Sequence, residues 1–137
     1  MASGDVSQNI ERLRAVIEAF NRTGQIDLSF VDPDFEMHQA SSIIDTAGVF
    51  YGRGALELAQ SELKESFEDF SYEAEQFLET PDGRVLVFIR ARARGRGSGI
   101  EMDNRIAWVW AFRDDKAVRL DVYEERDEAL KAVGLKR

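Results

Sequence analysis

In the first half of the chain, apolar residues recur at spacings of three and four, which is typical of one face of an α-helix. Ser7 can cap a first helix, and Gly24 can end it in a left-handed conformation. A second long helix is predicted over 54–67, and a short helix over 26–30 lies between the two. The two long stripes comprise Ile10, Leu13, Ile17 and Phe20, and then Leu56, Ala59, Leu63 and Phe67.

Between these helices the periodicity is lost. Asp32-Pro33-Asp34 has the chemistry of a turn, and a short strand is predicted over 35–38. The segment 39–50 follows neither a helical nor a strand period. We therefore expect a loop there, lying over the mouth of a pocket.

After residue 70 the period changes to two, which indicates β-strands. The pattern predicts a closing helix over 125–133, with Gly134 as its stop. Helices followed by a meander of strands predict one α+β domain spanning 1–137. The predicted strands are 71–79, 84–94, 100–112 and 117–123, with turns at 81–83, 95–99 and 114–115.

Alternate positions of three neighbouring strands carry charges of opposite sign, so we expect them to share the outer, solvated face. The opposite parity is mostly apolar and should form the inner wall. The charged set comprises Glu73, Glu75, Arg90, Arg92, Arg94, Glu101, Asp103 and Arg105. The inner set comprises Tyr72, Ala74, Gln76, Leu78, Val85, Val87, Ile89, Ala91, Asn104, Ile106, Trp108, Trp110 and Phe112.

The last strand leaves two alternatives for its inner face. One is Val118, Leu120 and Val122, and the other is Arg119, Asp121 and Tyr123. Hydrophobic pattern alone favours the first set.

The composition of the chain disfavours several classes of partner and of catalytic chemistry. The 137 residues carry a net charge of −8, which disfavours nucleic acids and anionic membranes as partners. The absence of cysteine excludes thiol catalysis and disulfides. One histidine and scattered carboxylates predict neither a metal site nor a cofactor. Residues 1–8 lack the apolar core of a signal peptide, so a cytoplasmic location is expected.

Several stretches, in this order, resemble SnoaL-like members of the nuclear transport factor 2-like superfamily, over nearly the whole chain. They are Phe20-Asn21-Arg22-Thr23-Gly24, 32–38, Tyr51-Gly52-Arg53-Gly54, 95–99, 106–110 and 128–135. The resemblance implies a cone-shaped barrel: a curved, mainly antiparallel sheet packed on three N-terminal helices around an apolar pocket. The superfamily includes ketosteroid isomerases, polyketide cyclases, epoxide hydrolases, dehydratases and binding modules, so the fold does not define the reaction.

The resemblance also assigns positions. His38 falls where the isomerases keep their general base, whereas Trp108 and Ile17 fall at their oxyanion-stabilising positions, which disfavours a ketosteroid isomerase proper. Ile89 and Ala91 fall where the epoxide hydrolases keep part of their catalytic triad, which indicates that this triad is absent.

For the last strand, the resemblance places Arg119, Asp121 and Tyr123 inward, against the simple hydrophobic pattern. We adopt this second register as the sequence-based prediction. It would bring Asp121 into the same cavity as His38.

Two functions follow from this reading. The first is a cofactor-independent acid–base enzyme, an isomerase, cyclase or dehydratase acting on a small apolar carbonyl or hydroxyl compound. His38 would be the base or acid that transfers the proton, and Asp121 would orient the imidazole or share its proton. Tyr123 or Tyr51 would stabilise the charge that develops on the substrate oxygen. The second is a non-catalytic module that binds a small hydrophobic ligand. The predicted ligand contacts are Tyr51, Asn104, Trp108 and Trp110.

Each of these residues also has a purely structural interpretation. His38 could be a merely structural histidine at a strand end, Asp121 could be a surface carboxylate on the outer face, and the tryptophans could be core. Whether His38 and Asp121 face the cavity discriminates between the two functions. A homodimer is also predicted, because an apolar strip would otherwise be exposed on the outer face. The strip comprises Phe88, Ala107, Val109 and Ala111.

Overall fold

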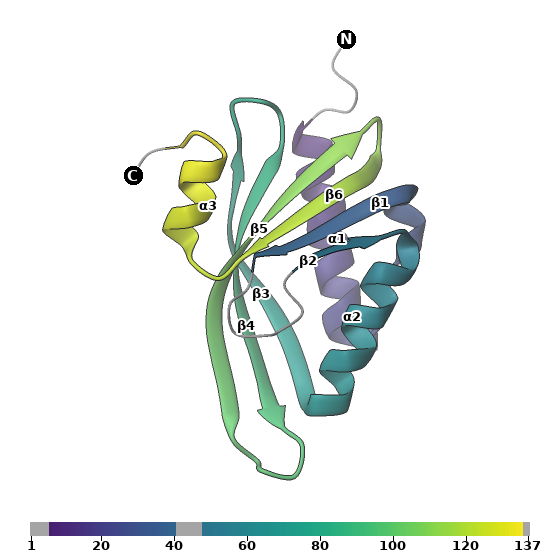
Figure 1. Ribbon diagram of the computed structural model, residues 1–137, viewed down its shortest axis with the longest axis vertical. Coiled ribbons are helices and arrows are strands. Elements are labelled where there is room, and N and C mark those ends of the chain that lie inside the picture. The colour runs from purple at the N-terminus through teal and green to yellow at the C-terminus, as the bar shows by residue number, and fades with distance from the viewer. Residues whose placement is uncertain (1–5, 41–47, 136–137) are drawn as a thin grey trace.

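Six strands form one strongly curved sheet, and two long helices lie against its inner face (Figure 1). The computed structural model describes residues 6–40 and 48–135. The strand order is β2-β1-β6-β5-β4-β3; β1 and β6 are parallel, and every other pair is antiparallel. The elements are α1 (Val6–Thr23), a 3-10 turn (Leu28–Phe30), β1 (Val31–Ala40), β2 (Gly48–Tyr51), α2 (Arg53–Ser66), β3 (Phe67–Glu79), β4 (Val85–Gly95), β5 (Glu101–Arg113), β6 (Lys116–Tyr123) and α3 (Arg126–Ala132).

The main core lies between the helices and the inner face of the sheet. Leu13 and Ile17 of α1 and Leu56 of α2 are buried against it, as the helical stripes predicted. Gly24 ends α1 with a φ of 77° and donates its N–H to the carbonyl of Phe20 at 2.7 Å. The curved α+β architecture is therefore confirmed.

Two segments differ from the predicted loops. Asp32-Pro33-Asp34 does not break the chain but lies inside β1. The Asp34 N–H donates to the Asp32 carboxylate at 2.8 Å, and the pairing with β6 shifts between Val31 and Glu36. The turn chemistry is thus accommodated as an irregularity of the strand. Of the loop predicted over 39–50, residues 39–40 form the end of β1 and residues 48–50 lie in β2, whereas 41–47 lies outside the described residues.

An irregularity in β3 changes which side chains face inward. The pairing with β4 shifts between Ala74 and Gln76, so Phe77 joins the inner core. Gln76 and Leu78 pair with Phe88 and Leu86 of the outer face. Their predicted inner position is therefore wrong, because simple alternation does not hold across a bulge.

The outer face carries a second apolar cluster, which α3 covers. Leu86, Phe88, Ala107 and Val109 pack against Ala129, Leu130 and Val133. Phe88 is 5% exposed and Ala107 is fully buried. Three of the four residues of the strip that was expected to be exposed, Phe88, Ala107 and Val109, are thus covered by the chain's own helix, and Ala111 is half-buried outside this cluster. That ground for a homodimer is wrong, and dimerisation itself remains a prediction.

Among the helices of the described residues, none combines the length and apolar character needed to cross a membrane.

Candidate functional site

The sheet places the predicted catalytic residues on the outer face. Asp121 pairs with Val109 of the outer cluster, whereas Leu120 pairs with Trp110 of the inner core. The inward register adopted for Arg119, Asp121 and Tyr123 is therefore wrong, and Leu120 and Val122 of the alternative set belong to the inner core. At the start of β6 the inner-core residue is Ala117 rather than Val118, because the pairing with β5 shifts between Ala111 and Phe112. Burial of apolar area decides the register of this strand.

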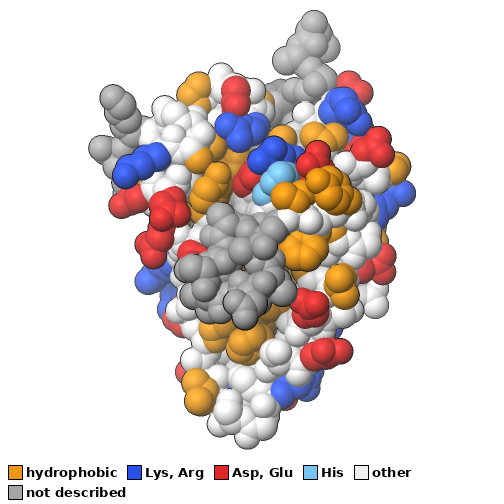
Figure 2. All heavy atoms as spheres, viewed as in Figure 1, with side chains coloured by type: hydrophobic (Ala, Val, Ile, Leu, Met, Phe, Trp, Pro, Cys, Tyr) orange, Lys and Arg blue, Asp and Glu red, His pale blue; other side chains and the backbone are white. Residues whose placement is uncertain are grey.

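His38 lies on the same outer face. It is the direct neighbour of Asp121 in the parallel pairing of β1 and β6, while Met37 beside it is buried in the inner core. Figure 2 shows the single histidine at the surface, among acidic and basic side chains. His38 and Asp121 are thus neighbours in the sheet, but on the outer face and not in a cavity, as was expected of them.

Their side-chain contacts run along each strand. The Nε2 of His38 lies 3.1 Å from Oε1 of Glu36. Arg119 donates from Nε and from a terminal nitrogen to the two carboxylate oxygens of Asp121, both at 2.9 Å. Asp121 is 8% exposed, so this bidentate pair compensates an almost buried charge. Asp121 is thus held by an arginine, and the catalytic roles of both residues remain predictions.

The other predicted site residues lie in different parts of the sheet and do not form one site. Tyr51 is 72% exposed on β2, and Tyr123 packs against the outer cluster, where burial raises the pKa of its hydroxyl group. Asn104 pairs with Ala91 on the inner parity but is exposed. Trp108 and Trp110 both contribute to the inner core, as predicted.

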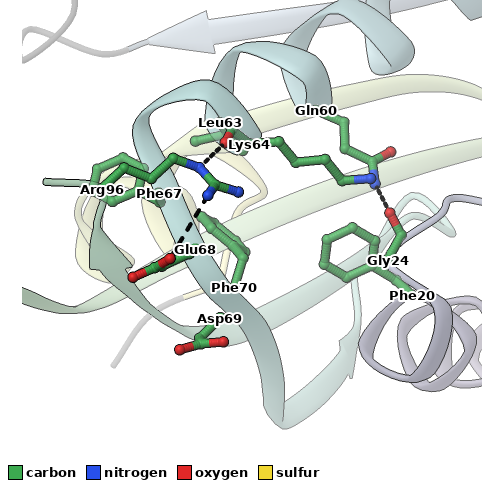
Figure 3. Close-up of a pocket in the computed structure, with 10 residues that line it drawn as sticks. All are labelled: Phe20, Gly24, Gln60, Leu63, Lys64, Phe67, Glu68, Asp69, Phe70 and Arg96. Atoms are coloured by element: carbon green, nitrogen blue, oxygen red, sulfur yellow. Dashed lines mark hydrogen bonds and ion pairs between the residues drawn. The ribbon is translucent and has the colours of Figure 1, made fainter. Parts of the chain in front are cut away.

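A pocket of about 190 Å³ opens between the ends of α1 and α2 and the start of β3 (Figure 3). Its walls combine three phenylalanine rings with the side chains of four charged residues. The lining residues are Phe20, Gly24, Gln60, Leu63, Lys64, Phe67, Glu68, Asp69, Phe70 and Arg96. The amide of Gln60 donates to the carbonyl of Gly24 and ties α2 to the end of α1.

A bulge at the start of β3 builds the aromatic wall of this pocket. Asp69 has a φ of 54°, and the pairing with β4 shifts between Glu68 and Ser71. The extra residue in the strand lets Phe67 and Phe70, three positions apart, both line the pocket. Regular alternation would send them to opposite faces.

The charged groups of the pocket are largely paired. Arg96 donates from Nε to the carbonyl of Lys64 at 2.6 Å, and its guanidinium lies 3.7 Å from Glu68. Asp69 lies 3.8 Å from Arg94. The ammonium group of Lys64 has no hydrogen-bond or ion-pair partner among the described residues. Both carboxylates are therefore compensated, and Lys64 provides a cation at the pocket mouth.

A continuous row of aromatic rings leads from the pocket into the core. The centroid of the Tyr72 ring lies 5.2 Å from the ring centroid of Phe20 and 4.9 Å from that of Phe70. Both phenylalanines line the pocket. On its other side, Tyr72 lies 4.8 Å from Trp108, which lies 6.1 Å from Trp110. The row ends at Phe30 and Phe35, 5.5 and 6.2 Å from Trp110.

Tyr72 is held in place by its backbone. The side chain of Asn21 at the end of α1 donates to the Tyr72 carbonyl at 2.7 Å and accepts from its N–H at 2.9 Å. These two hydrogen bonds attach α1 to the edge strand β3. The position of the ring is thus set by the same helix end that forms the pocket.

The pocket contains residues that the sequence interpretation did not select. Phe67 was assigned to the helix, Arg96 to a plain hairpin tip, and Lys64 and Phe70 were not considered. The available signal was the spacing of Phe67 and Phe70 around two acidic residues, which is consistent with a bulge but does not specify one.

Comparison with known proteins identifies the fold. No family model matches the sequence, and no curated protein matches it. Among solved structures, a nuclear transport factor 2-like protein of unknown function from Burkholderia pseudomallei K96243 is 19% identical, with a TM-score of 0.71 over 91% of this chain and 96% of that chain. A SnoaL-like protein from Jannaschia sp. CCS1 is 15% identical, with a TM-score of 0.70 over 96% and 94%.

TerC, crystallised with polyporic acid, is 21% identical, with a TM-score of 0.71 over 91% of this chain and 96% of its own. These likenesses span nearly the whole length of both partners. The chain therefore has the nuclear transport factor 2-like fold, as the sequence resemblance implied.

Proposed function

We propose that this protein binds a small, flat, largely apolar molecule in the pocket between α1, α2 and β3. The observation that carries the proposal is that the pocket lies at one end of the aromatic row. Phe20 and Phe70 line the pocket, and the rings of both contact Tyr72. A concave site with aromatic walls and a few polar groups is typical of small-molecule binding.

The size of the pocket limits the ligand. A volume of about 190 Å³ is below the range of drug-sized sites, roughly 300–1,000 Å³. An apolar cavity of about 150 Å³ holds benzene. The pocket therefore fits one ring or two fused rings.

The geometry favours binding over acid–base catalysis. The enzyme interpretation requires His38 and Asp121 in the cavity, and both lie on the outer face. Small-molecule binding by TerC, which shares the fold, supports a ligand for this chain. A non-catalytic binding domain is thus the function we propose, and isomerisation, cyclisation or dehydration is the alternative.

Two variants of α2 test the location of the site. Leu63 lines the pocket, and Leu58 on the same helix is 54% exposed and lies outside it. Leu63→Trp should fill the pocket, whereas Leu58→Trp adds the same indole at the surface. Binding of indane and 1-indanone is measured by ligand-observed NMR, and native mass spectrometry of the purified protein reports any retained molecule.

We expect the native chain and Leu58→Trp to bind with equal affinity, and Leu63→Trp to bind at least about 10-fold more weakly. Equal binding by both variants would place the site elsewhere. Lack of binding by the native chain, with no retained molecule, would overturn the proposal.

A further inference from the structure

The wall of the pocket between α1, α2 and β3 contains one cation without a partner. Lys64 lies in the last turn of α2, and its ammonium makes no hydrogen bond or ion pair with the described residues. A Cβ atom at Gly24 would lie 3.7 Å from this nitrogen, and Gly24 also lines the pocket. Figure 3 shows the Lys64 side chain reaching from α2 toward Gly24. The ammonium is thus held at the pocket, beside the end of α1.

The two carboxylates of the pocket wall do not neutralise this cation. Glu68 lies 3.7 Å from Arg96, and Asp69 lies 3.8 Å from Arg94. Arg94 also lies 3.9 Å from Glu101, which is outside the pocket wall. Each carboxylate of the wall therefore has an arginine beside it, and the ammonium on α2 is left to a partner from outside the chain.

Backbone carbonyl groups at the ends of the two helices are occupied as well. Arg96 donates from Nε to the Lys64 carbonyl at 2.6 Å and from its backbone N–H to the Ser66 carbonyl at 3.0 Å. The carbonyl of Gly24 accepts from the amide of Gln60. Carbonyl groups at the end of a helix attract cations. Because other donors already bind these carbonyls, the ammonium of Lys64 is available to an acceptor in the pocket.

We propose that the molecule bound in this pocket is a flat aromatic compound that carries a carboxylate. Its ring lies against Phe20, Phe67 and Phe70, and its carboxylate pairs with the ammonium of Lys64. The inference rests on the proposed function and specifies the class of its ligand. A neutral hydrocarbon leaves the ammonium unpaired, and an amine brings a second positive charge beside it.

The negative charge of the whole chain does not prevent this pairing. The net charge is −8, but exposed charges that are more than about 10 Å apart are largely screened at 0.1 M salt. A carboxylate in contact with Lys64 is much closer than that. Because Lys64 is exposed, the carboxylate stays partly in water, and its desolvation costs little. The pairing should therefore weaken as salt is added.

The test uses three ligands of one shape and a matched set of variants. Indane, indane-2-carboxylate and 2-aminoindane share one ring skeleton and are neutral, negative and positive at neutral pH. Lys64→Met removes the charge and keeps an unbranched side chain, and Lys64→Arg keeps the charge. Lys131→Met makes the same change of net charge at an exposed position of α3, outside the pocket wall. Ligand-observed NMR gives the dissociation constants.

We expect the native chain to bind indane-2-carboxylate about 5-fold more tightly than indane, as a partly exposed ion pair does, and 2-aminoindane most weakly. Lys64→Met should weaken the carboxylate by about 5-fold and leave indane within about 2-fold. Lys64→Arg and Lys131→Met should retain the preference for the carboxylate. Raising the salt from about 0.05 M to about 0.5 M should reduce this preference in the native chain.

Three results would overturn the carboxylate inference and leave the proposed function standing. The first is equal binding of indane and indane-2-carboxylate by the native chain. The second is a preference for the carboxylate that survives in Lys64→Met or is lost equally in Lys131→Met. The third is tighter binding of 2-aminoindane, which would mean that the rings and carboxylates of the wall select a cation. Failure of all three compounds to bind the native chain would instead overturn the proposed function.

Discussion

The two faces of the sheet satisfy their polar groups in different ways. On the outer face, charged side chains pair with each other: Arg90 makes a bidentate contact with Asp103 at 2.9 and 2.6 Å, and Arg119 does the same with Asp121. On the inner face, the indole of Trp110 is buried and has no partner among the described residues. The buried Nε of Arg126, over the outer face, also has no partner, but a terminal nitrogen of the same guanidinium donates to Glu75.

This difference bears on how function is inferred. Residue types that suit catalysis already have side-chain partners: Asp121 accepts two hydrogen bonds from Arg119, and His38 lies 3.1 Å from Glu36. The inner face has little acid–base chemistry, but it has one buried donor without a partner among the described residues, in an aromatic row that ends at the pocket. Unsatisfied polar groups in an apolar setting are therefore a better indication of a binding site here than titratable groups at the surface.

Truncation of the inner aromatic row should have the largest effect. Trp110→Ala removes an indole that is 5% exposed and should lower the free energy of unfolding by about 3–5 kcal/mol, because a cavity remains. Urea denaturation measures the change. Ile100→Ala, at a side chain that is 71% exposed, is the control and should stay within about 0.5 kcal/mol. Similar losses in both variants would contradict the assignment of the faces.

On the outer face, burial should separate two arginine–carboxylate pairs. Arg119→Ala leaves the carboxylate of Asp121, 11% exposed, without its partner, and should cost about 1–2 kcal/mol. Arg92→Ala breaks a 3.2 Å contact with Glu73 in which both side chains are about half exposed, and should cost below about 0.5 kcal/mol. Chemical denaturation of both variants gives the comparison. A larger loss for Arg92→Ala would mean that burial of Asp121 is not the deciding factor.

The bulge at Asp69 at the start of β3 should tolerate glycine but not a β-branched residue. Asp69 has a φ of 54°, where a β-branched side chain is strained, so Asp69→Val should lower the free energy of unfolding by about 1–2 kcal/mol. Asp69→Gly should stay within about 0.5 kcal/mol, because glycine adopts this conformation freely. Thermal denaturation distinguishes the two. If valine is tolerated as well as glycine, the bulge is not what brings Phe67 and Phe70 together.

The smallest effect should come from acid titration of the β3–β4 turn. Hydrogen bonds from Arg84 and Thr80 lower the pKa of Asp82 from 3.8 to about 2. A lowered pKa stabilises the fold above about pH 4, and this contribution is lost as the pH falls toward 2. The carboxylate is 57% exposed, so solvent screening limits the contribution to below about 1 kcal/mol. Asp82→Asn should flatten stability over this pH range, and an unchanged pH profile would show that the turn does not hold this carboxylate.

Much of the fold was predictable because it depends on periodicity. The stripes of α1 and α2 and the four long strands follow from the spacing of apolar residues. The failures occurred at irregularities. The Asp32-Pro33-Asp34 segment and the two shifts in β3 depend on pairing between distant strands, which local sequence does not specify.

The candidate site was less predictable for the same reason. The inward placement of Asp121 followed a resemblance rather than the hydrophobic pattern, and the pattern was correct for Leu120 and Val122. The pocket brings together α1, α2, β3 and the tip at Arg96, which are remote in sequence. Of the aromatic row, strand parity placed Tyr72, Trp108 and Trp110 on the inner face, and the helical stripe selected Phe20.

One NMR titration tests the central claim that the inner face, and not the outer face, recognises the ligand. The chain has two tryptophans and one histidine, so indole signals report on the inner face and a single imidazole reports on the outer face. On addition of 1-indanone, we predict that the indole N–H signals shift in a saturable manner while the imidazole signals of His38 stay in place. Saturable shifts of the His38 signals with unchanged indoles would contradict the account.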